Sequence, residues 1–192
     1  MLPKFSVAVE DPAWPERGGG KCKRGADRHY GLMTVADIVA LPIGDVMADD
    51  AHYWLWATDN YLHAAMHVLE ARGFRYVRTF QWVKMDGGRL QTGLGQYGRG
   101  AHEHLLLGTR GASAVPTPDN RPPSVILAPR TKHSQKPDAA WAVIDRVSSG
   151  RPGPRIEFNC RTPRPGWTGV GHEVGVSIED FCARYRGGAL EA

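Results

Sequence analysis

Short apolar runs alternate in this sequence with segments whose apolar residues recur at helical spacing. Residues 5–10 (FSVAVE) and 53–57 (YWLWA) have the length and the aliphatic and aromatic content of buried strands. Residues 59–72 instead repeat apolar residues every three to four positions, with Asp59 or Asn60 as the expected N-cap. This alternation predicts an α/β fold, in which a mostly parallel sheet carries helices on both faces.

The other elements give weaker signals of the same kind. Thr34 and Asp37 have the spacing of a capping box, which predicts a short helix that ends before Pro42. The chain has 192 residues, of which 42% are hydrophobic, so we expect one core and a single domain over residues 1–192. Further strands are expected at 76–84, 104–108, 125–128 and 155–158, further helices at 137–147 and 177–186, and a long glycine-rich loop at 85–101.

Charge and cysteine content narrow the class of protein. A formal net charge of +4 and a pI near 9.1 favour an anionic partner such as nucleic acid, although many proteins without one are mildly basic. Cys22, Cys160 and Cys182 form no CxxC pair, which argues against a disulfide framework and a zinc knuckle, and for a reducing compartment. Because we see no basic leader and no apolar stretch near the ~20 residues of a membrane span, we expect a cytoplasmic protein with no membrane partner.

Two of the expected strands end in polar motifs. Asp11-Pro12-Ala13-Trp14 follows the first strand, and Glu157 opens the segment 157–161 (EFNCR) at the end of a later one. Ligands collect at the carboxyl ends of strands in parallel sheets. Asp11 and the rigid Pro12 carbonyl are two acceptors for an amino group, Trp14 offers a face to an unstacked base, and Glu157 could hold ribose hydroxyls. A turn, a core tryptophan and a solvated charge explain the same residues equally well.

Two further motifs have ordinary explanations. Residues 93–98 match GxGxxG, but the residues that follow show no helical pattern, so a pyrophosphate would meet no helix N-terminus. His102 and His104 suggest a metal cluster, yet they lack the i, i+4 spacing of HExxH and no further ligand set is obvious. We interpret them as a histidine pair at the start of a strand. Residues 15–29 are rich in Gly, Lys and Arg and are expected to form a basic loop.

Taken together, eight segments between about Phe5 and Glu173 resemble the MT-A70 family of S-adenosylmethionine (SAM)-dependent adenine-N6 methyltransferases. That family includes the catalytic subunit of the eukaryotic messenger-RNA m6A writer and many bacterial and phage DNA enzymes. The segments are DPAW (11–14), HYGLMT (29–34), WLWATDNYL (54–62), RGFRY (72–76), WVK (82–84), GLGQYGRGAHEHLLLGTRG (93–111), HSQKPD (133–138) and RIEFNCRTPRPGW (155–167).

The resemblance implies a Rossmann-like methyltransferase fold in a permuted order, with the catalytic motif N-terminal to the SAM-binding strand. It implies direct methyl transfer without a metal, with Lys136 pairing with the methionine carboxylate of SAM, and Glu157 and Arg161 facing its ribose and adenine. The implied catalytic residues are Asp11, Pro12 and Trp14. The implied SAM-binding residues are Asp11, Lys136, Glu157, Asn159, Arg161, His172 and Glu173. The residues implied to border the target nucleotide are Lys21, Lys23, Arg24, Tyr30, Gln96, Tyr97 and Arg99.

Three positions depart from the family pattern: Ala13 replaces a proline of DPPW, Asn159 replaces an aromatic residue, and His172 replaces an asparagine. They leave open a non-catalytic, nucleic-acid-binding subunit as the alternative to an active enzyme. For an active enzyme we expect DNA as the substrate, because the chain is small, has no evident RNA-reading appendage and is rich in Ala, Gly and Arg as in bacterial or phage proteins; RNA is the alternative. The target base must be flipped out or single-stranded. A homodimer or a heterodimer with a related subunit fits this family.

Overall fold

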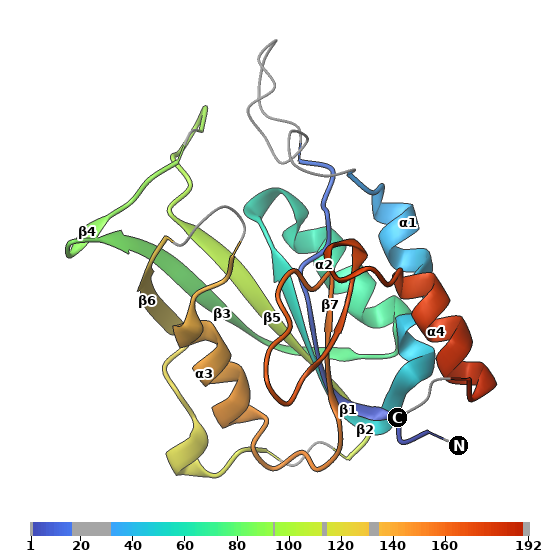
Figure 1. Cartoon of the computed structure of the whole chain (residues 1–192). Coiled ribbons are helices and arrows are strands. Elements are labelled where there is room, and N and C mark those ends of the chain that lie inside the picture. Colours follow the sequence, from blue (N-terminus) through green and yellow to red (C-terminus); the bar gives the residue numbers. More distant parts are fainter. Residues whose placement is uncertain (1, 17–31, 94, 113–114, 131–134, 190–192) are drawn as a thin grey trace.

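The structure is a computed structural model, and it describes residues 2–16, 32–93, 95–112, 115–130 and 135–189. Within these residues the strands form one mixed sheet in the order β4-β3-β5-β2-β1-β7-β8, with β6 paired to β3 (Figure 1). The strands are β1 (Phe5–Glu10), β2 (Met47–Ala57), β3 (Arg75–Asp86), β4 (Arg89–Leu90), β5 (His102–Arg110), β6 (Val125–Pro129), β7 (Arg155–Phe158) and β8 (Thr168–Val170). The α-helices are α1 (Val35–Ala40), α2 (Leu62–Ala71), α3 (Asp138–Val147) and α4 (Ile178–Gly187).

Strand direction decides which residues meet at each edge of the sheet. β1 pairs in parallel with β2 and β7, β7 with β8, and β3 with β6, which confirms the prediction of an α/β fold with a mostly parallel sheet. β5 lies between β2 and β3 and is antiparallel to both. Its first residues therefore lie at the edge where β1, β2, β3 and β7 end, as the pairing of Ala57 with His104 shows. We call this the carboxyl edge.

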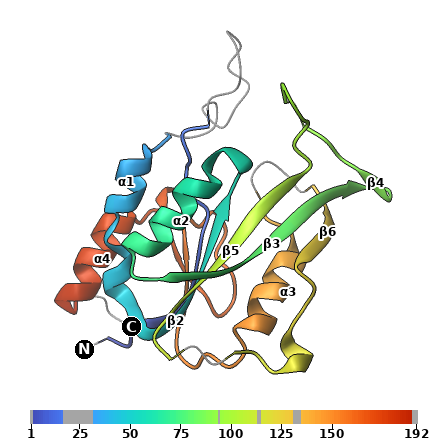
Figure 2. The same ribbon diagram turned by 180° about the vertical axis from the view of Figure 1, so that it is seen from behind.

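The helices cover both faces of the sheet. α1, α2 and α4 lie on one face and α3 on the other (Figures 1 and 2). Successive side chains of a strand point to opposite faces, so β2 feeds both cores: Tyr53 and Leu55 pack on the side of α2, and Trp54 and Trp56 on the side of α3. β1 and the end of β2 are continuously buried because helices cover both faces of the sheet, and most of their residues are accordingly apolar.

Several elements differ in extent from the expectation. The capping box of Thr34 and Asp37 is present, and α1 ends at Ala40 as predicted. The segment after β2 begins as a 3-10 turn, η3 (Asp59–Tyr61). Its N-cap position is occupied by Thr58 rather than by Asp59 or Asn60, and the Asp59 carboxylate instead forms a hydrogen bond with the His104 ring. The expected loop 85–101 contains the short β4 hairpin, and β2 begins six residues before the run 53–57. Among the described residues no helix is long and apolar enough to cross a bilayer.

A buried ionic cluster fixes the end of β1. Glu10 is completely buried, and its carboxylate accepts hydrogen bonds from the Tyr53 hydroxyl at 2.7 Å and from the Arg72 guanidinium, whose Nη2 lies 3.1 Å from Oε1. Arg72 Nη2 also donates to the Ile38 carbonyl at 2.9 Å, so the cluster joins β1, β2, α1 and the end of α2. Because Asp11 follows Glu10 directly, this cluster sets the position of the first polar motif at the carboxyl edge.

Removing the guanidinium should therefore unfold the protein more easily. Arg72→Ala leaves Glu10 as a buried charge without its partner, which costs about 3–5 kcal/mol of unfolding free energy. Chemical denaturation followed by circular dichroism measures this loss. Arg75→Ala, three residues away on an exposed position, is the matched control and should change stability by less than ~0.5 kcal/mol. Equal losses in the two variants would contradict the role assigned to the cluster.

Candidate functional site

A row of alternating charges crosses the carboxyl edge. Asp11 follows β1, Lys136 precedes α3, Glu103 lies in β5 and Lys84 lies near the end of β3. Lys136 Nζ lies 3.0 Å from Asp11 Oδ2 and 2.8 Å from Glu103 Oε2, and Lys84 Nζ lies 2.7 Å from Glu103 Oε1. The Lys136 ammonium also lies 4.9 Å from the centre of the Trp56 ring. Lys136 is therefore held by two carboxylates and an aromatic face.

These contacts shift the protonation equilibria in opposite directions. Burial raises the pKa of the Asp11 carboxyl, and the Lys136 ammonium opposes this rise. Glu103 is also desolvated, but the ammonium groups of Lys136 and Lys84 outweigh that effect and hold its pKa at about 2. Burial alone would lower the pKa of Lys136, yet Asp11 and Glu103 raise it above its usual value. At neutral pH Lys136 is thus a cation that shares its charge between Asp11 and Glu103.

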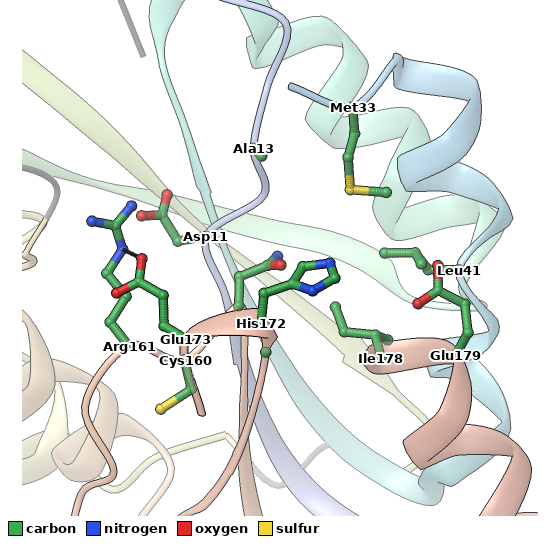
Figure 3. A pocket seen from close by; sticks show the side chains of 12 residues that line it. Asp11, Ala13, Met33, Leu41, Cys160, Arg161, His172, Glu173, Ile178 and Glu179 are labelled. Carbon is green, nitrogen blue, oxygen red and sulfur yellow. Dashed lines mark ion pairs between the residues drawn. The ribbon is translucent and has the colours of Figure 1, made fainter. Parts of the chain in front are cut away.

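Two cavities meet at Asp11. The Met33 cavity has a volume of about 340 Å³ and the Lys136 cavity about 500 Å³, both within the ~300–1,000 Å³ typical of small-molecule sites. Both are lined by Asp11, Asn159, Arg161 and Glu173. The Met33 cavity adds Ala13, Met33, Leu41, Ile178, His172 and Glu179 (Figure 3). The Lys136 cavity adds, among others, Trp56, Lys136, Trp141, Glu157, Arg164 and Pro165. One ligand, or two in contact, could fill both spaces beside the Asp11 carboxylate.

The boundary between the two cavities is polar. Arg161 Nε lies 3.4 Å from Glu173 Oε1, and Figure 3 shows this pair beside Asp11. Glu157, at the end of β7, is partly buried, and desolvation raises the pKa of its carboxyl although it is hydrogen-bonded to the Cys160 thiol. The same burial and the nearby Glu157 charge raise the pKa of Cys160 to about 12, so this thiol is protonated at neutral pH.

Asn159 leaves a donor without an acceptor at this boundary. Its φ of 56° places it in the left-handed region, which asparagine tolerates better than an aromatic residue. Its side-chain Nδ2 is buried and has no hydrogen-bond partner among the described residues. A buried amide donor without a partner costs about 1–3 kcal/mol. A ligand oxygen at the junction of the two cavities would remove this cost.

The residues after Asp11 form a tight turn. The Pro12 carbonyl accepts a hydrogen bond from the Trp14 amide at 2.8 Å, which leaves one lone pair for a ligand. The expectation that Trp14 presents an aromatic face to a base is wrong for this structure. Its side chain is only 5% exposed, stacks on Tyr61 with ring centres 5.4 Å apart, and donates to the Trp56 carbonyl at 2.9 Å. Trp14 therefore anchors the motif to the core.

Of the residues predicted to border a target nucleotide, the three that the structure describes do not line either cavity. Gln96, Tyr97 and Arg99 are exposed in the segment beyond β4, with Tyr97 fully exposed, while the Arg99 Nε donates to the Gly93 carbonyl at 3.0 Å. The GxGxxG match of residues 93–98 precedes a strand, as expected, and no helix. Lys21, Lys23, Arg24 and Tyr30 lie outside the described residues.

The seven residues expected to bind a cofactor, by contrast, all line one of the two cavities. Sequence reasoning missed Glu103, Lys84 and Trp56 as part of this site. From the sequence, Trp56 is predictable only as a residue of a strand, and Glu103 only as the residue between two histidines. The signal that could have found Glu103 is an acidic residue at the start of an apolar strand, where a carboxylate has no reason to be buried unless it is paired. Only the reversed direction of β5 places it opposite Lys136.

Comparison with known proteins agrees with this geometry. The family model described as MT-A70 matches residues 5–173. The chain is 27% identical to an N(6)-adenosine-methyltransferase MT-A70-like protein of Drosophila melanogaster, over 94% of this chain and 29% of the relative.

Two human relatives match this chain at similar identity and coverage. The N(6)-adenosine-methyltransferase catalytic subunit METTL3 is 27% identical over 97% of this chain and 31% of its own length. The N(6)-adenine-specific methyltransferase METTL4 is 25% identical over 88% of this chain and 37% of its own. The chain thus spans roughly a third of the length of these relatives. With a matching segment that runs from β1 to η5 (His172–Val174) and contains both strand-end motifs, the chain belongs to the MT-A70 family.

Proposed function

We propose that this protein transfers a methyl group from SAM to the N6 amine of adenine in a nucleic acid. The observation that carries the proposal is the position of Asp11, which lines both cavities and lies 3.0 Å from the largely buried Lys136 ammonium. The methyl donor of MT-A70 methyltransferases is SAM. When bound, it supplies an electrophilic methyl group on a positively charged sulfur.

The chemistry of the two cavities matches the two ends of SAM. Lys136 offers a buried cation for the amino-acid carboxylate, and Asp11 offers an acceptor for its ammonium group. The Met33 cavity has apolar walls at Met33, Leu41 and Ile178, against which a purine can pack. The unpaired Asn159 amide, with Arg161 and Glu173, lies between them, where the ribose hydroxyls need partners. The residues present therefore fit the cofactor: Lys136 and Asp11 would hold its amino-acid end, and it would supply a methyl group on a sulfonium.

The catalytic task falls to Asp11 and Pro12. The N6 lone pair of adenine is delocalised into the ring, so the amine attacks only when acceptors hold its two hydrogens and let the nitrogen become pyramidal. Asp11 supplies a carboxylate oxygen, and Pro12 supplies the remaining lone pair of its carbonyl. As the new N–C bond forms, the C–S electron pair returns to sulfur, and the amine loses one proton to solvent. Positioning by these two groups should provide most of the rate enhancement.

For the nucleic acid we propose DNA, with RNA as the alternative. The Ala-, Gly- and Arg-rich composition is typical of bacterial and phage proteins, for which DNA is the expected substrate and the cytoplasm the expected compartment. The relatives' names include both N(6)-adenosine and N(6)-adenine, so they are compatible with either nucleic acid. The net charge of +4 supports an anionic partner of either kind. A homodimer or a heterodimer with a related subunit stays our prediction for the assembly.

The second candidate is a non-catalytic subunit that binds nucleic acid. The departures from the family pattern at Ala13, Asn159 and His172 favour it, since all three residues line the Met33 cavity. The charge pattern of Asp11, Lys136 and Glu103 favours the enzyme, because desolvated ion clusters beside open cavities concentrate at catalytic and ligand-binding sites.

The test uses SAM carrying a deuterated methyl group. The protein is incubated with single-stranded DNA, duplex DNA and RNA of matched sequence, and the digested nucleosides are measured by mass spectrometry. We expect labelled N6-methyladenine in DNA, and in single strands or mismatched sites more than in perfect duplex. Label in RNA alone would support the alternative substrate. If the protein does not bind SAM and no nucleic acid acquires label, the enzyme proposal is overturned in favour of the non-catalytic subunit.

A further inference from the structure

A second polar cluster lies on the opposite face of β5 from Glu103. Its members are Asp59, His102 and His104, and we call it the Asp59 cluster. His104 Nε2 lies 2.6 Å and His102 Nε2 lies 3.1 Å from the same oxygen, Asp59 Oδ1. The ligand atoms of all three residues lie within 4.8 Å of one another, and the two imidazole rings are 4.9 Å apart at their centres. Solvent exposure increases across the cluster, from buried His104 through partly buried His102 to exposed Asp59, so solvent reaches one side of the cluster.

The sheet brings these residues together. His102 and His104 are two positions apart in β5, so their side chains share a face, while Glu103 points to the other face and contacts Lys136. Ala57 of β2 pairs with His104. Two residues beyond Ala57, η3 therefore places Asp59 opposite His102, where the chain leaves the sheet. The i, i+2 spacing that does not suit a helix suits a strand, and the third ligand comes from η3, the turn that follows the neighbouring strand β2.

We propose that the Asp59 cluster binds a divalent transition-metal ion of the zinc type. Two imidazole nitrogens and one carboxylate oxygen are ligands that such ions take at distances of about 2.0–2.2 Å, with open positions left for water. In the metal-free protein the shared Asp59 oxygen holds both rings. An ion would replace these hydrogen bonds, with the hydrogen of each neutral ring moving from Nε2 to Nδ1 so that Nε2 can coordinate.

One feature sets the expected strength of the site. The Nδ1 atom of His104 is buried and has no hydrogen-bond partner among the described residues. Coordination through Nε2 moves the ring hydrogen to Nδ1, where it lacks the acceptor that metal-binding histidines usually have. We therefore expect binding in the micromolar range rather than the tight binding of a closed structural zinc site.

The position of the cluster gives the ion a role. Tyr61, two residues after Asp59, stacks on Trp14 and donates a hydrogen bond to the Pro15 carbonyl at 2.8 Å. Thr58, one residue before it, donates to the Glu16 carboxylate. A metal ion at Asp59 would thus tie the segment 14–16 to β5 through η3, and would stabilise the turn that carries Asp11. This inference does not depend on methyl transfer as the reaction.

The test measures metal binding to the full chain without a polyhistidine tag. Calorimetry with Zn²⁺ should show one ion per chain, and Co²⁺ should give the visible absorption of a site with nitrogen and oxygen ligands. His102→Ala and Asp59→Ala should each weaken Zn²⁺ binding at least ten-fold. His67→Ala, an exposed histidine of α2 outside the cluster, is the matched control and should leave the affinity unchanged.

Two results would overturn the inference. The first is a wild-type protein that binds no Zn²⁺ at millimolar concentration. The second is binding that His102→Ala and Asp59→Ala leave within three-fold of wild type, since the ion would then sit elsewhere. Thermal unfolding in the presence of a chelator should be the same for wild type and the His102→Ala variant, which shows that a lost affinity reflects a lost ligand. The expected rise in Tm with Zn²⁺ should appear in wild type and not in that variant.

Discussion

Asp11→Ala is expected to abolish methyl transfer, with a loss of turnover of about 10³-fold or more. Removing one group that stabilises a reacting centre in a water-excluded site costs about 10²–10³ in kcat, and Asp11 is proposed to hold both the target amine and the ammonium of SAM. The measurement is the initial rate of labelled N6-methyladenine formation at saturating SAM. Nucleic-acid affinity should stay within a few-fold, because the carboxylate repels phosphate rather than binding it.

Two further variants make this result specific. Asp11→Asn keeps an oxygen acceptor but loses the charge and turns an amide donor toward Lys136, so it should retain more activity than the alanine variant and still be severely impaired. Glu70→Ala removes an exposed carboxylate on α2 and should behave as wild type. An Asp11→Ala protein that turns over within ten-fold of wild type would remove Asp11 from the catalytic role.

Lys136→Ala should weaken SAM binding by about 10²-fold or more. Removing one partner of a buried, hydrogen-bonded charge pair costs about 2–5 kcal/mol, and this partly buried pair should lie toward the lower end of that range, with Asp11 left without its counter-ion. Burial raises the pKa of the Asp11 carboxyl and Lys136 opposes that rise, so loss of Lys136 should raise this pKa further. Activity that depends on ionised Asp11 should therefore be lost at a higher pH in the variant, as pH falls through the raised pKa. Calorimetry and a pH–rate profile measure the two effects.

A SAM analogue that lacks the amino-acid end distinguishes loss of carboxylate recognition by Lys136 from general damage to the fold. 5′-Methylthioadenosine has the adenosine and sulfur of SAM but neither its carboxylate nor its ammonium group, so its affinity should be nearly the same in wild type and Lys136→Ala. Lys84→Ala is the matched control, because it removes the other partner of Glu103 and leaves Lys136 beside Asp11. Equal weakening of both ligands by Lys136→Ala would show that Lys136 shapes the cavity rather than binding the carboxylate.

Two kinds of element could be predicted from the sequence. Strands buried on both faces are mostly apolar along their length, as in β1 and the end of β2. Helices with a recognisable capping motif are the second kind, as with Thr34 and Asp37 at the start of α1. The two-residue β4 and the three-residue β8 were not predictable, because each is too short to carry a pattern of its own and exists only through pairing, with β3 and β7 respectively. The same holds for the start of β2, where Met47 is in the sheet because β1 provides Phe5 as a partner.

Part of the candidate site could likewise be predicted from the sequence, and part of it depends on tertiary structure. The sequence by itself predicted that Asp11 and Glu157 lie at the ends of two strands, that these strands belong to a parallel sheet, and that their polar ends share an edge. It could not determine that β5 runs backwards, since direction depends on how distant strands pair rather than on local pattern. That reversal places Glu103 against Lys136 on one face and the two histidines against Asp59 on the other. It is also tertiary packing, against Tyr61, that made Trp14 an anchor instead of an open surface. Local sequence fixes which groups are available, and only long-range pairing, whose energy comes from contacts between remote segments, decides which of them meet.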